Sequence, residues 1–232
     1  MNPGRNRPVE ITFDRRFRGP LTSANGGYAC GRLAAFVDAD AVEVTLRLPP
    51  PLDRSLTVHG SGEGVVLLDG DAIVAEARPA HLELDVPSPV SVAAAEDART
   101  RHVRNVPAVF AECFTCGIRE DGDGLEVYVG AVSGREPLHA APVTFRDRSY
   151  EFVWAAIDCP GAYAVGAVGR GETVLGRMIA RVHRLPENGE TCIVTAWPLG
   201  EDGRKLLAGT ALFAADGELL AFARQVWIVP RS

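Results

Sequence analysis

Apolar and polar positions alternate along much of the chain with the period of two that is typical of β-strands with one buried face. The stretch 42–48, Val-Glu-Val-Thr-Leu-Arg-Leu, shows this alternation most clearly, and three consecutive prolines end it. The pattern predicts strands at 9–13, 42–48, 55–59, 64–68 and 72–77. Asp69-Gly70 between the last two is a strong hairpin signal. We therefore expect an antiparallel meander in the first third of the chain, in which consecutive strands are neighbours.

A helical pattern at 22–37 follows the first of these strands. It begins with Thr, Ser and Asn, whose side-chain oxygens accept hydrogen bonds from first-turn N–H groups. Gly26 and Gly27 carry no Cβ, so a ligand atom can approach their N–H groups closely. Such a helix N-terminus is a candidate anion or oxyanion site, and an ordinary loop-to-helix junction is the other interpretation.

The same succession of elements recurs in the second half. The pattern there predicts a helix at 150–165, interrupted by Pro160. Strands are predicted at 125–132, 142–145, 173–183, 191–197, 204–213 and 219–229. The alanine-rich stretch 91–104 predicts a surface helix within a connecting segment. The chain thus divides into an N-terminal domain at 1–86, a connecting segment at 87–124 and a C-terminal domain at 125–232.

An antiparallel sheet has to bury its apolar face, and in each domain the single helix is the long element available to cover it. We therefore predict an α+β fold in which two antiparallel sheets each wrap around a central helix. This arrangement is a double hotdog, an intrachain pseudo-dimer whose sheets meet edge to edge and so hide two open edges. A two-layer sandwich and a split barrel are the alternatives.

Composition and charge indicate which partners and which cellular compartment fit the sequence. The 232 residues carry a net charge of −6, which argues against a nucleic-acid-binding surface. No apolar run is long enough to span a bilayer, and the N-terminus lacks the apolar core of a signal peptide. Five cysteines without an export signal favour reduced thiols and a cytoplasmic localisation.

Three stretches resemble members of the hotdog-fold acyl-CoA thioesterase superfamily, particularly fused double-hotdog proteins. Asn25-Gly26-Gly27-Tyr28 is similar to the glycine turn that opens the central helix in such enzymes. The stretch 156–164, Ala-Ile-Asp-Cys-Pro-Gly-Ala-Tyr-Ala, resembles the helix segment that carries the carboxylate in the phenylacetate-type group. The stretch 113–117, Cys-Phe-Thr-Cys-Gly, is similar to the entry into a hotdog strand in related proteins.

The spacing of these motifs predicts a single composite site. In the phenylacetate-type pattern an acidic residue lies seven positions after the second glycine, which here is Ala34. Seven positions before Asp158 stands Glu151, where the pattern has a glycine. Family dimers combine the glycine turn of one subunit with the acidic residue of the other. We therefore expect Gly27 of the first domain to meet Asp158 of the second, and the pair Ala34 and Glu151 to be inactive.

The resemblance implies thioester hydrolysis, which needs an activated water and stabilisation of an oxyanion. The predicted catalytic residues are Asp158 as general base or nucleophile, Gly27 as the oxyanion donor through its N–H, and Asn25 as an orienting group. The alternatives are purely structural roles: a carboxylate that only accepts hydrogen bonds within the protein for Asp158, and an ordinary helix cap for Asn25. The predicted substrate-binding residues are Gly26, Tyr28, Ser23 and Trp154.

Two other features of the sequence do not predict a further activity. Cys113 and Cys116 have the spacing of metal ligands, but no second pair completes a tetrahedral set, so no metal site is predicted. The hydratase branch of the fold has a histidine five positions after the aspartate. Here that position is Tyr163, which disfavours hydration chemistry.

These observations predict an acyl-CoA thioesterase that hydrolyses a fatty or aryl acyl thioester. The coenzyme A moiety belongs to the substrate, and no other cofactor is expected. The expected assembly is a homo-oligomer of double hotdogs, without nucleic acid or a membrane span. The alternatives are a non-catalytic acyl or acyl-CoA binding protein and a purely structural dimerisation module.

Overall fold

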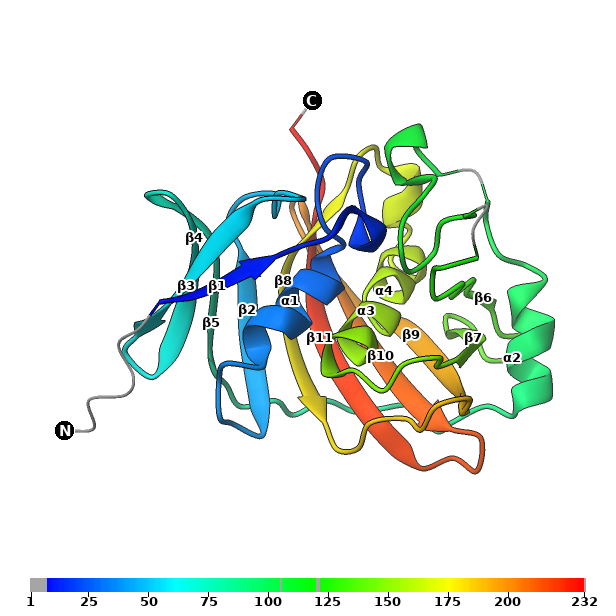
Figure 1. Ribbon diagram of the computed structural model, residues 1–232. Coiled ribbons are helices and arrows are strands. Elements are labelled where there is room, and N and C mark those ends of the chain that lie inside the picture. Colours follow the sequence, from blue (N-terminus) through cyan, green and yellow to red (C-terminus); the bar gives the residue numbers. More distant parts are fainter. Residues whose placement is uncertain (1–7, 105, 120–121, 232) are drawn as a thin grey trace.

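The computed structural model describes residues 8–104, 106–119 and 122–231. In this part of the chain eleven strands form one continuous antiparallel sheet (Figure 1). The strands are β1 (Val9–Thr12), β2 (Ala41–Leu46), β3 (Ser55–Ser61), β4 (Gly64–Asp69), β5 (Ala72–Pro79), β6 (Gly130–Ala131), β7 (His139–Thr144), β8 (Val174–Val182), β9 (Thr191–Asp202), β10 (Lys205–Ala214) and β11 (Leu219–Ile228). The helices are α1 (Gly26–Ala34), α2 (Val92–Arg99), α3 (Tyr150–Ala156) and α4 (Cys159–Ala164), with short 3₁₀ turns η1 (Arg15–Phe17), η2 (Ala108–Phe110) and η3 (Ala167–Gly169).

The strand order shows that the second half repeats the topology of the first. Across the sheet the strands run β1-β3-β4-β5-β2-β8-β11-β10-β9-β7-β6. Reading outward from the centre, β2-β5-β4-β3-β1 on one side corresponds to β8-β11-β10-β9-β7 on the other. The halves join where β2 pairs with β8, with Val44 opposite Met178. The predicted edge-to-edge junction is therefore present, and it turns the two expected sheets into one.

Helices α1 and α3, the central helices of the two halves, lie side by side on one face of this sheet (Figure 1). They approach closely because α1 has glycines where α3 crosses it. A Cβ at Gly31 would lie 2.6 Å from Glu151 Cα and 2.9 Å from Trp154 Cβ. The largest fully buried side chains of this shared core include Phe13, Leu33, Leu56, Leu67, Phe114, Phe145, Trp154, Ile157, Met178, Leu206 and Leu212. One core thus spans both halves of the chain.

The opposite face of the C-terminal half is covered by the connecting segment. Successive strand residues point to opposite faces, so Ile193 and Phe213 lie on this outer side while Val194 and Leu212 face the helices. Helix α2 is shorter than the predicted 91–104, and its buried alanines pack against this outer cluster. The segment is therefore part of the packed structure as well as a link.

Two local predictions were wrong. Most of the strand predicted at 125–132 lies outside the sheet, because Leu125 and Val127 donate their N–H groups to Phe114 O and Thr115 O, each over 2.8 Å. The predicted meander of the first half is also interrupted, since β2 pairs with β5 and β8 instead of β3. Among the described residues, no helix is long and apolar enough to cross a membrane.

Candidate active site

Asp158 stands in a break between two helices. Helix α3 ends at Ala156 and α4 begins at Cys159, and Asp158 has a non-helical ψ of −81°. Pro160 sits in the first turn of α4, where the missing N–H costs no helical hydrogen bond. The break therefore comes before the proline, and it turns the Asp158 side chain toward α1.

A buried amide holds the backbone of this break. Gln225 Nε2 donates to Ile157 O over 2.5 Å and to Asp158 O over 3.1 Å. Trp227 Nε1 donates to Gln225 Oε1 over 2.8 Å, so the amide is held from both ends. Sequence reasoning missed Gln225, although a polar residue within the apolar run of β11 was the available signal.

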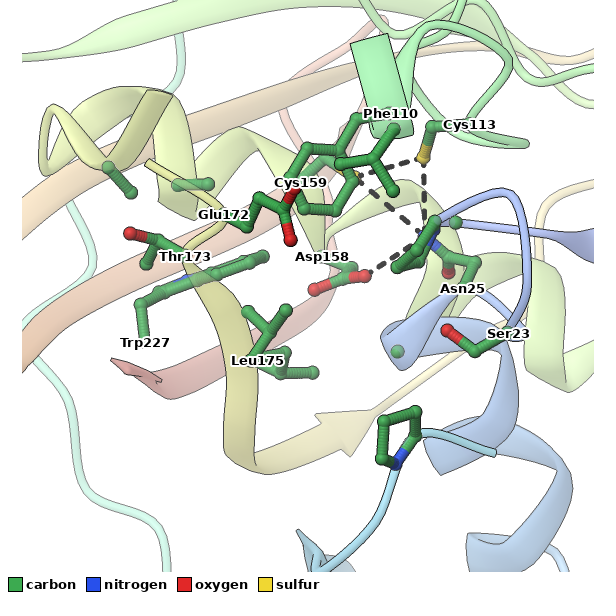
Figure 2. Close-up of a pocket in the computed structure, with 18 of the residues that line it drawn as sticks. Ser23, Asn25, Phe110, Cys113, Asp158, Cys159, Glu172, Thr173, Leu175 and Trp227 are labelled. Atoms are coloured by element: carbon green, nitrogen blue, oxygen red, sulfur yellow. Dashed lines mark hydrogen bonds between the residues drawn. The ribbon is translucent and has the colours of Figure 1, made fainter. Parts of the chain in front are cut away.

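The N-terminus of α1 supplies the partners of the Asp158 carboxylate (Figure 2). Asn25 caps the helix, because its Oδ1 accepts from Tyr28 N–H over 2.8 Å. Its Nδ2 donates to Asp158 Oδ2 over 3.1 Å, and the Gly27 N–H donates to the same oxygen over 2.8 Å. The structure thus brings together the glycine turn of the first half and the carboxylate of the second, as the spacing predicted.

Burial dominates the electrostatics of this carboxylate. Asp158 is 2 % exposed, and desolvation raises its pKa to about 7, while the Gly27 N–H and the Asn25 amide act in the opposite direction. Its Oδ1 has no hydrogen-bond partner among the described residues. That oxygen points away from Asn25, toward Leu175 and Trp227 (Figure 2). One carboxylate oxygen is therefore fixed, and the other is buried without a hydrogen-bond partner among the described residues.

A cavity of about 490 Å³ opens beside Asp158. Asn25, Gly26, Ser23 and Asp158 contribute to its wall. Most of the remaining wall is apolar and includes Leu46, Leu48, Val109, Phe110, Ala162, Val168, Leu175 and Trp227. A largely apolar cavity with a few convergent polar groups has the character of a small-molecule site.

Three predicted site residues have other positions. Tyr28 does not line the cavity; its ring stacks on Phe17 with centroids 4.1 Å apart. Trp154 is fully buried in the core. The Gly27 N–H is already bonded to Asp158, so it orients the carboxylate and is not free for a thioester oxygen. The Gly26 N–H at the cavity wall has no partner among the described residues and replaces Gly27 as the candidate oxyanion donor.

The opposite pair has no comparable arrangement. Ala34 is buried and offers no polar side chain. Glu151 lies 3.9 Å from Arg32 Nε and does not line the cavity. The described structure therefore contains the expected asymmetry between the two halves.

Three thiols gather at the end of the cavity beside Asn25. Cys113 and Cys116 lie in the turn after η2, and Cys159 joins them from the start of α4, 46 positions beyond Cys113. The sequence spacing did not reveal this third thiol. Hydrogen bonds from the Cys116 and Cys159 thiols lower the pKa of Cys113 well below its usual value. All three cysteines are free.

The duplicated strand order, with both central helices on one face, defines a hotdog-type fold, and solved structures share it over the full chain. A protein of Novosphingobium aromaticivorans, described provisionally as a thioesterase, matches with a TM-score of 0.67, 13 % identity and 100 % of both chains covered. A hot dog fold protein of unknown function from Alicyclobacillus acidocaldarius matches at 0.65, with 12 % identity, covering 100 % of this chain and 96 % of its own. Acyl-CoA thioesterase II TesB2 from Mycobacterium marinum matches at 0.59, with 12 % identity, covering 97 % and 93 %.

These similarities establish the fold. No protein-family model and no curated protein matches the sequence. The dehydratase domain of a mycocerosic acid synthase-like polyketide synthase also matches, with a TM-score of 0.62, 13 % identity and coverage of 100 % and 98 %. The fold is thus shared by proteins of different activities, and the reaction has to be argued from the site.

Proposed function

We propose that this protein hydrolyses acyl-CoA thioesters with a fatty or aryl acyl group, through a site shared by its two halves. The observation that carries the proposal is the Asp158 carboxylate. One of its oxygens is held by Gly27 and Asn25, and the other has no partner at a largely apolar cavity. A desolvated, oriented carboxylate of this kind is suited to act on a bound water or on a carbonyl carbon.

In the proposed reaction, Asp158 Oδ1 takes a proton from a water in the cavity. The water oxygen forms a bond to the thioester carbonyl carbon, and the carbonyl oxygen becomes an oxyanion. The Gly26 N–H and the positive end of the α1 dipole stabilise that oxyanion. The carbon–sulfur bond then breaks, and the coenzyme A thiolate takes the proton from Asp158.

The cavity wall favours an apolar acyl group. Phe110, Leu175 and Trp227 are among the side chains that line the cavity beside Asp158. An acyl chain or aryl ring in this space would exclude bulk water from the carbonyl carbon. The coenzyme A moiety is part of the substrate and is released as the thiol.

The side chains favour hydrolysis over dehydration. Dehydration of a hydroxyacyl group needs a base and an acid positioned on neighbouring carbons. Of the described residues that line the cavity, none is a histidine, and Tyr163 occupies the position five after Asp158. The Asp158 carboxylate with the nearby Gly26 N–H instead matches the requirements of water addition to a carbonyl.

Thiol release from a panel of acyl-CoA esters tests the proposal. We expect turnover by the wild type and a loss of about 10²–10⁴-fold in kcat for Asp158→Asn, which keeps the size of the side chain. Glu96→Gln changes an exposed carboxylate on α2 and serves as the matched control. The hydrolase proposal fails if the wild type releases no thiol, or if Asp158→Asn keeps full activity.

The same panel separates the alternative of a non-catalytic acyl-CoA binding protein. A ligand that binds only the folded state raises the melting temperature without any turnover. Thermal stabilisation by acyl-CoA in the absence of thiol release would favour that alternative.

A further inference from the structure

The three thiols beside the cavity have the arrangement of a metal site. The Sγ atoms of Cys113, Cys116 and Cys159 all lie within 4.8 Å of one another, and those of Cys113 and Cys159 are 3.6 Å apart. A zinc–sulfur bond of about 2.3 Å in tetrahedral geometry separates the sulfurs by about 3.8 Å. The thiols are therefore close to ligand distances without a rearrangement of the chain.

The turn that carries two of the thiols is held in place. The Gly117 N–H donates to Cys113 O over 2.7 Å, and a side chain at Gly117 would overlap the Glu112 and Cys113 backbone. Thr115 Oγ1 donates to Ala155 O over 2.9 Å, which ties the turn to α3. Pre-organisation of this kind reduces the ordering cost of binding.

An amide N–H group of Asn25 lies beside two of the sulfurs. Asn25 Nδ2 lies 3.7 Å from the sulfurs of both Cys113 and Cys159. Donors of this type orient thiolate ligands and stabilise their negative charge.

The thiol cluster borders the cavity. All three cysteines and Tyr163 contribute to the cavity wall. The Tyr163 side chain is 9 % exposed, and its hydroxyl lies near the Cys116 thiol without a hydrogen-bond partner among the described residues. A water or a substrate atom on the metal would supply that partner.

We propose that Cys113, Cys116 and Cys159 form a three-thiolate site for a zinc ion, with an exchangeable fourth ligand that hydrogen-bonds to Tyr163. Sulfur ligands and a tetrahedral arrangement favour zinc over the oxygen-seeking ions magnesium and calcium. The ion links the connecting segment to α4, the helix that follows Asp158. This proposal is independent of thioester hydrolysis.

The test is metal binding by the reduced, full-length protein after removal of metal with a chelator. Zinc is titrated in competition with a chromophoric chelator, and cobalt is used as a spectroscopic probe. We expect one equivalent of metal, thiolate-to-cobalt charge-transfer absorption and the visible bands of tetrahedral cobalt. Zinc is also expected to raise the melting temperature, since it binds the folded state.

Cysteine-to-serine variants test which residues are the zinc ligands. Cys116→Ser changes the most accessible of the three cysteines, so its fold is least at risk. We expect its zinc affinity to fall by more than about 100-fold, beyond the 10–100-fold typical of an outer-shell change. Cys192→Ser, which alters a buried thiol outside the cluster, is the matched control and should keep one equivalent.

Three results would overturn the site. They are the absence of cobalt–thiolate absorption in the reduced wild type, equal zinc affinity in Cys116→Ser and wild type, and a Cys113–Cys159 disulfide in the freshly purified protein by non-reducing peptide mapping. None of these results depends on thiol release from acyl-CoA, so failure of the metal site and failure of the hydrolase proposal remain distinguishable.

Discussion

The Gly27 N–H donates to Asp158 Oδ2 over 2.8 Å, which joins residues 131 positions apart in the sequence. The bond connects the N-terminus of α1 to the break between α3 and α4. Because α1 belongs to the first half of the chain and α3 and α4 belong to the second, neither half contains this arrangement alone. The backbone N–H of Gly27 therefore helps to hold the Asp158 carboxylate in position.

Gly27→Ala should damage both stability and activity. Its Cβ would overlap the Asp158 side chain and the Trp154 carbonyl oxygen, so α1 and α3 would have to separate. We expect a loss of about 1–3 kcal/mol in the free energy of unfolding, the usual cost of overpacking, together with reduced thiol release. Gly60→Ala is the control, because a Cβ there meets nothing within 4 Å. Equal urea midpoints for the two variants would contradict the close packing.

Gly26→Pro tests the oxyanion donor. Proline removes the N–H at the first position of α1, where its ring is well tolerated, and the extended backbone of Asn25 suits a following proline. We expect a fall in kcat of about 10²–10³-fold, as for the removal of one oxyanion-hole donor. Gly26→Ala adds a Cβ beside Leu175 but keeps the N–H, so it separates steric effects from the lost donor. Similar kcat values for the two variants would remove the role assigned to this N–H.

Asn25 combines a capping role and a donor role, and two substitutions separate them. Asn25→Ser keeps an oxygen that caps the helix but loses the Nδ2 donor to Asp158, whereas Asn25→Ala loses both. We expect Asn25→Ala to be less stable than Asn25→Ser by about 1 kcal/mol. The donor makes a charge-assisted bond of about 1.5–3 kcal/mol, so both variants should lose about 10- to 100-fold in kcat/KM. Full activity in Asn25→Ser would assign Asn25 to capping alone.

His102 should make stability depend on pH below neutrality. Burial lowers the pKa of His102, its Nδ1 donates to Val129 O over 2.9 Å, and the charges of Arg99 and Arg104 lower the pKa further. Its ring also contacts the rings of Tyr128 and Tyr163. The folded protein therefore binds a proton less readily at this position than the unfolded chain does.

Because of that difference, His102 makes the folded protein less stable as the pH falls. The stabilising contribution is complete above the unfolded pKa of about 6.5, and it is lost as the pH falls from there toward the lower folded value. Urea unfolding of wild type and His102→Gln between pH 8 and pH 5 checks this, because glutamine does not titrate. We expect the wild type to lose more stability than the variant across this range. Parallel stability–pH curves would show that His102 contributes nothing.

Local patterns in the sequence were sufficient for much of the secondary structure and for one half of the site. The alternation at 42–48 predicted β2, and Asp69-Gly70 marked the turn between β4 and β5. The capping residues before Gly26 placed the start of α1, since caps and hairpin turns depend on neighbours in sequence. The spacing argument also predicted that Asp158 would serve the glycine turn of the other half.

Only the tertiary structure decided which atoms of that site are free. It assigned the Gly27 N–H to Asp158 and left the Gly26 N–H at the cavity wall, a distinction between adjacent glycines that no residue pattern carries. It also brought Cys159 to Cys113 and Cys116, because the bond from Thr115 Oγ1 to Ala155 O ties their turn to the end of α3, just before Cys159. Sequence determines which groups the chain offers and the local shape around each. Distances between remote groups follow from how the two halves pack, and that packing is a property of the whole fold.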